Sequence, residues 1–287
     1  MRIGDWSFWY WVLSTVTADA AGCDCHCQLP YLAPMQRYGL IGRKLGHSFS
    51  KDHFTKVFAK VGLKDHRYDL FELAEISDFP HLLKKNPDLR GLNVTIPYKE
   101  DVIPYLDELD PLAAAVGAVN TIVIKNGRTK GYNTDVAGFR SLIGPMAIDL
   151  RDKGSDVKAR ALVLGSGGAS RAVAFVLREM GIRFRIVSRS RERGDLTWDL
   201  IDPTILRVCR LIINTTPLGM QPDVKDAPPL PYAALTAKHA LIDLVYNPEE
   251  TVFLRQGKEQ GAKTVGGLGM LNAQADEAWK IWQEAAK

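Results

Sequence analysis

Short apolar runs alternate with amphipathic segments along the chain from Met35 onward. This alternation is typical of a parallel sheet covered by helices, so it predicts an α/β fold. One helix is expected where Phe54, Val57, Phe58 and Val61 recur at helical spacing. In this first half of the chain the expected strands are Tyr38–Ile41, Arg67–Phe71, Gly91–Val94 and Thr121–Ile124, and the expected helices are Ser50–Val61 and Ala74–Leu83.

A second set of elements begins at the apolar run Ala161–Leu164. It is expected to continue with strands at Phe184–Val187, Leu211–Ile213 and Leu241–Val245 and with helices at Ala169–Met180 and Glu249–Lys258. The proline-rich stretch Pro222–Pro231 is expected to form a loop. A long closing helix is predicted over Leu268–Ala286, because apolar residues such as Ala275 and Trp282 fall on one face.

The length of the chain, 287 residues of which 46% are hydrophobic, favours two domains over one. The two sets of elements therefore predict two α/β domains with a cleft between them, the second a Rossmann-type doubly wound parallel sheet. The first domain is expected to comprise residues 36–135 and the closing segment 267–287. Residues 136–266 are expected to form the second domain.

Residues 1–35 are expected to be a disordered extension. The apolar run Trp6–Val16 spans only about eleven residues, too few for the roughly 20 that cross a bilayer. The cluster of Cys23, Cys25, His26 and Cys27 lacks the C-x-x-C pairing of closed zinc sites, so no metal is expected. Met35 directly precedes a strand-like run, which favours the hypothesis that translation begins there.

The charge and the cysteines narrow the choice of partners and compartment. The net charge is +4, and Lys and Arg are scattered among the acidic residues, so neither nucleic acid nor a membrane is an expected partner. Only Cys209 lies in the body of the chain, which excludes a disulfide framework there and fits a reducing cytoplasm. A monomer or a homodimer is expected.

A glycine-rich turn joins the strand Ala161–Leu164 to the helix that follows. Gly165, Gly167, Gly168 and Ala169 stand in the strand–turn–helix context that lays a pyrophosphate on a helix N-terminus. Gly165 allows the tight turn, and Gly167 allows close backbone approach. Ser170 departs from the Gly or Ala that this fingerprint expects. The turn predicts a dinucleotide site, and a tight turn without a ligand is the alternative.

The next strand predicts which dinucleotide binds. An NAD site places an acidic residue at the end of this strand, but here the strand is followed by Ser188, Arg189, Ser190, Arg191 and Arg193. Cations and hydroxyls suit a 2′-phosphate, so NADP is favoured over NAD. Alone, the same residues would be interpreted as a solvated basic loop.

Two polar stretches in the first domain carry candidate chemistry, Asn93–Lys99 at a strand end and Tyr132–Asp135 before a helix. Reduction of a ketone by hydride leaves an alkoxide, so the site needs a proton donor and a group that orients it. Lys99 and Asp135 can fill these roles. Asn93 and Thr95 alternate and are expected to point to the same side, whereas Lys99 taken alone could be a surface lysine.

Together these stretches resemble the shikimate dehydrogenase family, in order, over residues 36–287. The matching pieces are Tyr38–Gly42, Gly46–Ser50, Asn93–Lys99, Gly117–Thr121, Gly131–Asp135, Gly165–Ala169, Asn214–Pro217, Gly219–Met220, Tyr246–Pro248 and Gly267–Gln274. The resemblance implies reversible, NADPH-dependent reduction of 3-dehydroshikimate to shikimate in aromatic amino-acid biosynthesis. The family has no counterpart for residues 1–34.

The resemblance also implies a role for each matching residue. Lys99 would be the acid/base, and Asp135 would contact the same substrate hydroxyl. The substrate carboxylate would be held by Ser48 and Ser50, and its hydroxyls and ring by Asn93, Thr95, Asn120, Tyr246 and Gln274. The nicotinamide end would be lined by Asn214, Thr215, Thr216, Gly267 and Met270. Family members often have Asn-Arg-Thr where this chain has Ser188, Arg189 and Ser190, which leaves cofactor affinity less determined than cofactor identity.

Other functions remain open at this point. A quinate/shikimate dehydrogenase that uses NAD is disfavoured by the arginine cluster. A nucleotide-binding sensor without turnover is disfavoured by the presence of both Lys99 and Asp135. Methylenetetrahydrofolate dehydrogenase shares the architecture by analogy alone, and the residues expected at the substrate suit a small hydroxylated acid better than a folate.

Overall fold

The computed structural model describes residues 35–46, 49–147 and 160–287. The chain divides into two units, Met1–Pro34 and Met35–Lys287, and the second contains every described residue. The expected extension as far as Pro34, its cysteine cluster and Ser48 lie outside the described residues. Among the described helices, none combines the length and apolar character that a bilayer span requires.

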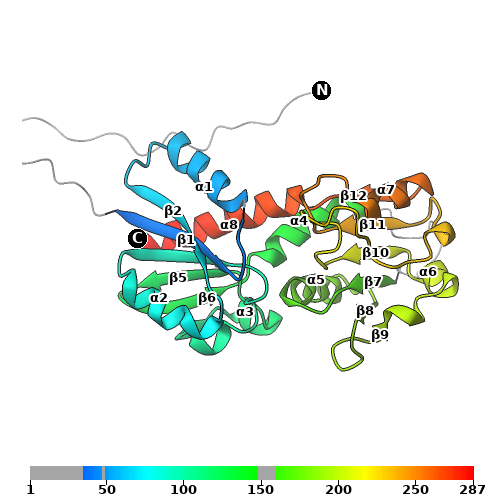
Figure 1. Ribbon diagram of the computed structural model, residues 1–287, viewed down its shortest axis with the longest axis horizontal. Coiled ribbons are helices and arrows are strands. Elements are labelled where there is room, and N and C mark those ends of the chain that lie inside the picture. The colour runs from blue at the N-terminus through cyan, green and yellow to red at the C-terminus, as the bar shows by residue number, and fades with distance from the viewer. Residues whose placement is uncertain (1–34, 47–48, 148–159) are drawn as a thin grey trace, which may run out of the picture. The chain divides into compact units, whose positions relative to one another are not determined.

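The first half of the second unit forms a six-stranded sheet in the order β2-β1-β3-β5-β6-β4 (Figure 1). Its strands are β1 (Gln36–Gly42), β2 (His66–Glu72), β3 (Leu89–Val94), β4 (Glu108–Leu109), β5 (Thr121–Lys125) and β6 (Arg128–Tyr132). The expectation of a parallel sheet is wrong here, because β5 runs antiparallel to both β3 and β6. Asn126 and Gly127, both at positive φ, form the tight turn that joins β5 directly to β6.

Three helices accompany this sheet, α1 (Phe49–Lys60), α2 (Phe79–Lys85) and α3 (Pro111–Val116). The helix expected over Ala74–Leu83 is a 3-10 turn, Ile76–Asp78, followed by α2. Pro80 lies in the first turn of α2, where its missing N–H costs no hydrogen bond, so the α-helix begins there. A further 3-10 turn spans Ile103–Tyr105.

The second sheet also has six strands, all parallel, in the order β12-β11-β10-β7-β8-β9. They are β7 (Ala161–Leu164), β8 (Phe184–Ser188), β9 (Leu196–Thr197), β10 (Leu211–Asn214), β11 (Ala240–Asp243) and β12 (Lys263–Val265). The order reverses between β7 and β10, which is the switch point of a doubly wound sheet. The predicted Rossmann-type sheet is therefore confirmed.

The described residues of the second half form the helices α4 (Asp135–Ala147), α5 (Gly168–Glu179), α6 (Pro203–Val208), α7 (Val252–Glu259) and α8 (Leu268–Ala286), with 3-10 turns at Trp198–Leu200 and Tyr232–Ala234. The helix expected from Glu249 begins later, at Val252. Thr251 caps it there, because its hydroxyl accepts from the Leu254 N–H and so ends the preceding loop.

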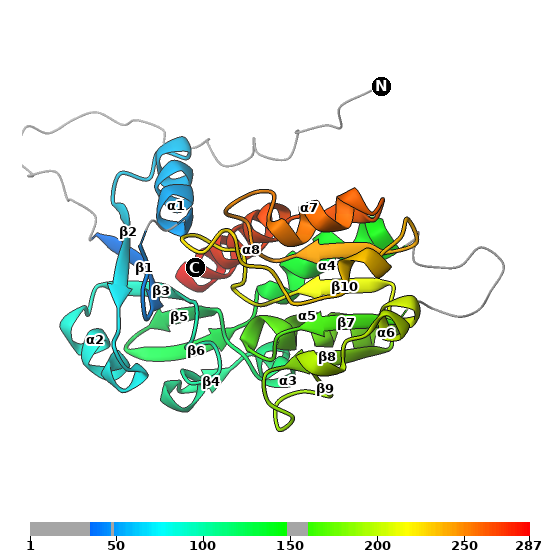
Figure 2. The ribbon, with the colours of Figure 1, turned by 45° about the vertical axis from the view of Figure 1, so that its right-hand side comes forward.

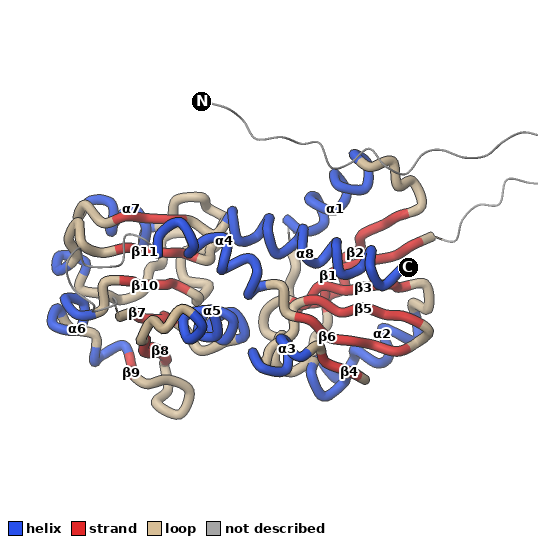
Figure 3. Tube along the Cα trace, turned by 180° about the vertical axis from the view of Figure 1, so that it is seen from behind, coloured by secondary structure: helices blue, strands red, loops and turns tan. Residues whose placement is uncertain are grey.

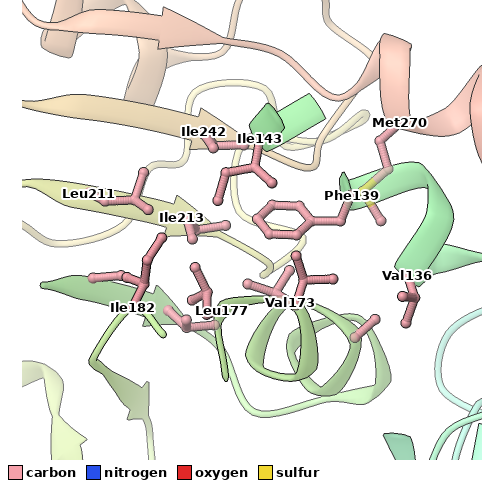
Figure 4. Packing of buried hydrophobic residues seen from close by; sticks show 14 of the residues in the cluster. Val136, Phe139, Ile143, Val173, Leu177, Ile182, Leu211, Ile213, Ile242 and Met270 are labelled. Carbon is pink, nitrogen blue, oxygen red and sulfur yellow. The ribbon is translucent and has the colours of Figure 1, made fainter. Parts of the chain in front are cut away.

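The second sheet has an apolar core on each face. Strand residues Ile213 and Ile242 pack against Phe139 of α4, Val173 of α5 and Met270 of α8 (Figure 4). Helices α6 and α7 belong to the same half (Figure 2). Their apolar residues form a second core with the same strands. The strands are therefore buried on both sides, which is why they are continuous apolar runs in the sequence.

Helix α8 connects this core to the first sheet. It packs along α4 (Figure 3) and continues onto β3 and β5. Trp282, almost fully buried, lies where a side chain on Gly91 would otherwise project, and its Nε1 donates to the Ile122 carbonyl at 3.0 Å. Asp135, at the start of α4 just after β6, and Gln274, in the first half of α8, thus reach the polar residues described next.

Candidate active site

Lys99 and Asp135 meet directly. Lys99 follows the end of β3, Asp135 is the first residue of α4, and Lys99 Nζ lies 2.7 Å from Asp135 Oδ2. The Lys99 side chain is 15% exposed and that of Asp135 is 5% exposed, so the pair is largely shielded from solvent. A Cβ on Gly168, at the start of α5, would stand 2.6 Å from Lys99 Cβ. The lysine stem therefore lies against the glycine turn.

Asn120 fixes the other side of the aspartate. Its buried Nδ2 donates to Asp135 Oδ1 at 3.0 Å, and Gln274 Oε1 of α8 lies 3.3 Å from the same nitrogen. Asn120 Oδ1 accepts from the Thr134 N–H at 2.7 Å. Each Asp135 oxygen thus has a partner, so the carboxylate is held in one orientation toward Lys99.

Asn93 is buried, and its side-chain amide makes hydrogen bonds to other residues of the protein. Its Oδ1 accepts from the Tyr68 hydroxyl at 2.8 Å, and its Nδ2 donates to Thr121 Oγ1 at 3.2 Å. Burial raises the pKa of Tyr68 well above its usual value, and a hydrogen bond with Ser50 opposes that rise. Ser50 and Asn93 are therefore both linked to Tyr68 and join this part of the site to α1.

Tyr246 and Thr95 are both half-buried. The Tyr246 ring lies 5.7 Å from the Phe49 ring, and burial raises the pKa of its hydroxyl. Tyr246 also lines an open cavity of about 390 Å³ together with Leu268 at the start of α8. The Thr95 N–H donates to the Ile41 carbonyl at 2.9 Å, which ties the turn that follows β3 to β1.

The glycine turn has the geometry that a bound pyrophosphate needs. Gly165 has φ +110°, and a Cβ there would stand 2.7 Å from Thr215 Oγ1, so only glycine fits. Gly167 is exposed, and no atom lies within 4 Å of where its Cβ would be. Ser170 is buried and donates to the Gly167 carbonyl at 2.6 Å, so the departure from the fingerprint supports the turn.

The end of β10 lies beside this turn. Asn214 Oδ1 accepts from the Thr216 hydroxyl at 2.6 Å, and its Nδ2 donates to Asp243 at 2.9 Å. Thr215 Oγ1 donates to the Leu164 carbonyl at 2.7 Å. Burial raises the pKa of Asp243 to about 6. The predicted residues Asn214, Thr215 and Thr216 are therefore gathered next to Gly165 at the switch point.

The segment after β8 gathers around Ser166 of the glycine turn. Ser188 Oγ lies 3.0 Å from Ser166 Oγ, the Ser190 N–H lies 3.4 Å from Ser188 Oγ, and Arg193 Nη2 donates to the Ser166 carbonyl at 3.1 Å. Arg189 is exposed. The hydroxyls of Ser188 and Ser190 and the Arg193 guanidinium thus lie together beside the turn.

Gly267 and Met270 lie at the start of α8. A side chain on Gly267 would meet the Leu244 carbonyl, and the Gly267 N–H donates to the Val245 carbonyl at 3.1 Å. Met270 is 7% exposed and belongs to the apolar core on α4 and α5. Both residues therefore place the start of α8 beside the loop that follows β11.

The structure adds two residues that the sequence did not single out. Glu100 Oε2 accepts from Arg171 Nη2 of α5 at 2.7 Å, immediately after Lys99. No sequence motif predicts the ion pair of Glu100 and Arg171, because the two residues are 71 positions apart. Within the described parts of the chain, no group of three His, Cys, Asp or Glu residues is arranged to hold a metal ion.

This arrangement can donate and accept a proton beside a dinucleotide turn. Lys99 can serve as the donor with Asp135 to orient it, and Asn120 and Gln274 offer further polar groups around the same point. The fingerprint turn stands next to the lysine stem. Carbonyl reduction by a bound nicotinamide is the chemistry that these groups fit.

Comparisons with known proteins agree with this chemistry. A family model described as the shikimate dehydrogenase substrate binding domain matches residues 40–122. A shikimate dehydrogenase (NADP(+)) from Halothermothrix orenii is 38% identical over 273 residues, which cover 86% of this chain and 90% of that protein.

Two solved structures are similar over most of the chain. Shikimate dehydrogenase 1 from Peptoclostridium difficile is 36% identical with a TM-score of 0.74, covering 87% of this chain and 92% of that one. Shikimate 5-dehydrogenase from Thermus thermophilus, in complex with NADP(H) and shikimate, is 34% identical with a TM-score of 0.74, covering 87% and 94%.

Proposed function

The chain belongs to the shikimate dehydrogenase family, and from that membership we propose that it reduces 3-dehydroshikimate to shikimate with NADPH, reversibly, in aromatic amino-acid biosynthesis. The observation that carries this proposal is the 2.7 Å contact of Lys99 with Asp135 beside the glycine turn. Such a contact places a proton donor where a ring ketone and a dinucleotide can meet.

The residues present fit NADP. Gly165 has the positive φ that the turn demands, Gly167 leaves open space for a pyrophosphate, and Arg189 and Arg193 supply the charge for a 2′-phosphate. Bound NADPH would supply the hydride. Asn214, Thr215, Thr216, Gly267 and Met270 would lie along its nicotinamide end.

Lys99 supplies the proton that the reduced oxygen needs. Its ammonium donates to the ring oxygen as the carbonyl becomes an alcohol, and in the reverse direction its neutral amine accepts that proton. Asp135 stabilises the ammonium and keeps it in place, while Asn120 holds Asp135 through its second oxygen. Ser48, Ser50, Asn93, Thr95, Tyr246 and Gln274 would bind the carboxylate, the ring hydroxyls and the ring.

Following nicotinamide absorbance with purified protein, shikimate and NADP⁺ tests this function. Lys99→Ala should reduce turnover by at least about a hundredfold, since general acid–base catalysis contributes about 10²–10⁴-fold. Its circular dichroism and melting temperature should stay close to those of the wild type. Survival of most of the activity would remove Lys99 from the mechanism.

The same assay separates the other functions. Faster turnover of quinate with NAD⁺ than of shikimate with NADP⁺ would identify a quinate/shikimate dehydrogenase. Binding of NADP⁺ with no turnover of either acid would indicate a sensor. We further propose a cytoplasmic enzyme, monomeric or homodimeric, whose partners are small molecules and not nucleic acid.

A further inference from the structure

Glu100 places its carboxylate between two arginines from the segments around the second sheet. Its Oε2 accepts from Arg171 Nη2 at 2.7 Å, and its Oε1 lies 3.8 Å from Arg193 Nη2. The Glu100 side chain is 23% exposed, against 47% for Arg171 and 60% for Arg193. One contact is thus a close ion pair, and the other is long and weak.

The close pair holds the backbone next to the candidate acid/base. Arg171 lies in the first turn of α5, and its Nη1 stands 3.2 Å from where a Cβ on Gly117 would be, so the guanidinium is confined on that side. Gly168, three residues earlier, already contacts the Lys99 stem. The backbone at Lys99 and Glu100 is therefore held against α5 by two contacts, one at Gly168 and one at Arg171.

The long contact involves a cation that the proposed function gives to the cofactor. Arg193 Nη2, the atom 3.8 Å from Glu100, also donates to the Ser166 carbonyl at 3.1 Å. A 2′-phosphate carries up to two negative charges and accepts stronger hydrogen bonds from arginine than a carboxylate at this distance. NAD has no such group and therefore cannot compete for Arg193.

We propose that Glu100 is a positioning residue that acts in two ways: through Arg171 it keeps Lys99 against α5, and through Arg193 it opposes binding of the cofactor's 2′-phosphate. The inference rests on the proposed function, because it requires Arg193 to meet that phosphate. Glu100 keeps its pair with Arg171 when Arg193 turns to the phosphate, so the lysine stays in place while NADP binds.

Equilibrium binding separates these effects from a general role in stability. In Glu100→Gln, which keeps the shape and removes the charge, the Kd for NADP⁺ measured by calorimetry should fall by up to about fivefold. The Kd for NAD⁺ should not change. Turnover should fall on the order of tenfold, because Lys99 is held less firmly. Tighter binding together with slower turnover is the signature expected.

Two further variants control the test. Glu179→Gln breaks the ion pair Arg140–Glu179, in which the arginine is as exposed as Arg171 and the glutamate is more exposed than Glu100. This pair joins α4 to α5, so the variant should change neither Kd nor turnover. In an Arg193→Met background, Glu100→Gln should no longer alter the Kd for NADP⁺. Should Glu100→Gln fail to fold, Glu100→Ser repeats the comparison.

Several results would overturn the inference: equal changes for NADP⁺ and NAD⁺, an unchanged or higher Kd for NADP⁺, unchanged turnover, or an effect that persists without Arg193. Failure of the proposed function is distinguishable from these. A wild-type protein that bound NADP⁺ no more tightly than NAD⁺ would contradict the cofactor assignment itself, whatever Glu100→Gln did.

Discussion

Arg189 and Arg193 follow the same strand, β8, but their surroundings differ. Arg193 is bonded to the Ser166 carbonyl, whereas no hydrogen bond or ion pair engages the exposed Arg189 guanidinium within the described residues. Arg189 would therefore give up no partner among the described residues on binding the proposed phosphate. That makes it the better target for testing cofactor choice.

Arg189→Ala should weaken NADPH binding roughly tenfold or more, because it removes charge-assisted hydrogen bonds of about 1.5–3 kcal/mol. The Kd for NADH should change little, since NADH lacks the 2′-phosphate. Fluorescence titration of both reduced cofactors measures the two constants. Equal losses for NADPH and NADH would show that Arg189 does not contact the 2′-phosphate.

Asp243 links the stability of the second sheet to pH. It is fully buried, and its carboxylate accepts from Asn214, from the Val245 N–H and from Thr251. Burial raises its pKa from 3.8 to about 6, against those hydrogen bonds. Because the pKa is higher in the folded than in the unfolded chain, the folded state binds the proton more tightly. The Asp243 contribution to stability therefore increases as pH falls from about 6 towards 3.8.

Asp243→Asn should remove this dependence, which amounts to about 3 kcal/mol for a shift of about two pH units. Urea unfolding of both proteins between pH 4.5 and about 7.5 gives the comparison. The free energy of unfolding of the wild type, relative to the variant, should be greater at the acidic end. Parallel curves would mean that Asp243 titrates at its ordinary pKa.

Individual residues of the site were predictable to different degrees. The motif residues Lys99, Asp135, Asn120 and Gln274 come together in the structure. Lys99 follows β3 and Asn120 precedes β5, while Asp135 begins α4 and Gln274 lies within α8. The hydrogen bonds of the Asn93 amide with Tyr68 and Thr121 could not be predicted from the sequence, because they depend on the register between strands. The Glu100 contact with Arg171 needs the two sheets placed side by side, which no local pattern encodes.

At the scale of the elements, two glycines at the start of α5 test how closely the glycine turn packs against Lys99. A Cβ on Gly168 would stand 2.6 Å from Lys99 Cβ, whereas Gly167 has extended backbone and no neighbour within 4 Å of its Cβ position. Gly168→Ala should lower stability by about 1–3 kcal/mol through overpacking and displace the lysine. Gly167→Ala should leave stability unchanged.

The two alanines should therefore separate in two measurements. Gly168→Ala should lower both the melting temperature and turnover. Gly167→Ala should keep the melting temperature of the wild type but weaken NADP⁺ binding. The added methyl group would stand where the proposed pyrophosphate comes close to the protein backbone. If both variants behaved alike, the spacing between α5 and Lys99 would not be what the structure shows.

Elements with strong apolar patterns were predicted well. Both β7 and α8 have the boundaries expected from the sequence. The short elements β4, β9, β12, α3 and α6 were missed because two to six residues carry too little periodicity. Strand β6 was also missed, although Asn126 and Gly127 are a recognised hairpin signal between β5 and β6.

At the scale of the whole molecule, the α/β class and the doubly wound second sheet could be predicted because short apolar runs alternate with amphipathic segments along the sequence. The mixed order of the first sheet does not, because antiparallel pairing depends on connections that the periodicity leaves undefined. The division at residues 135 and 267 stays a prediction. Helices α4 and α8 pack on each other, and α8 contributes to the cores on both sheets.

The packing of Trp282 on the first sheet has a consequence for folding during translation. A ribosome releases β1, β3 and β5 early, but the indole that packs over Gly91 and bonds to Ile122 lies in α8, 160 residues after Ile122. The nascent first sheet must therefore wait through a further 160 residues of synthesis before the indole can cover this part of it. A chain truncated before α8 would leave the space over Gly91 without that indole.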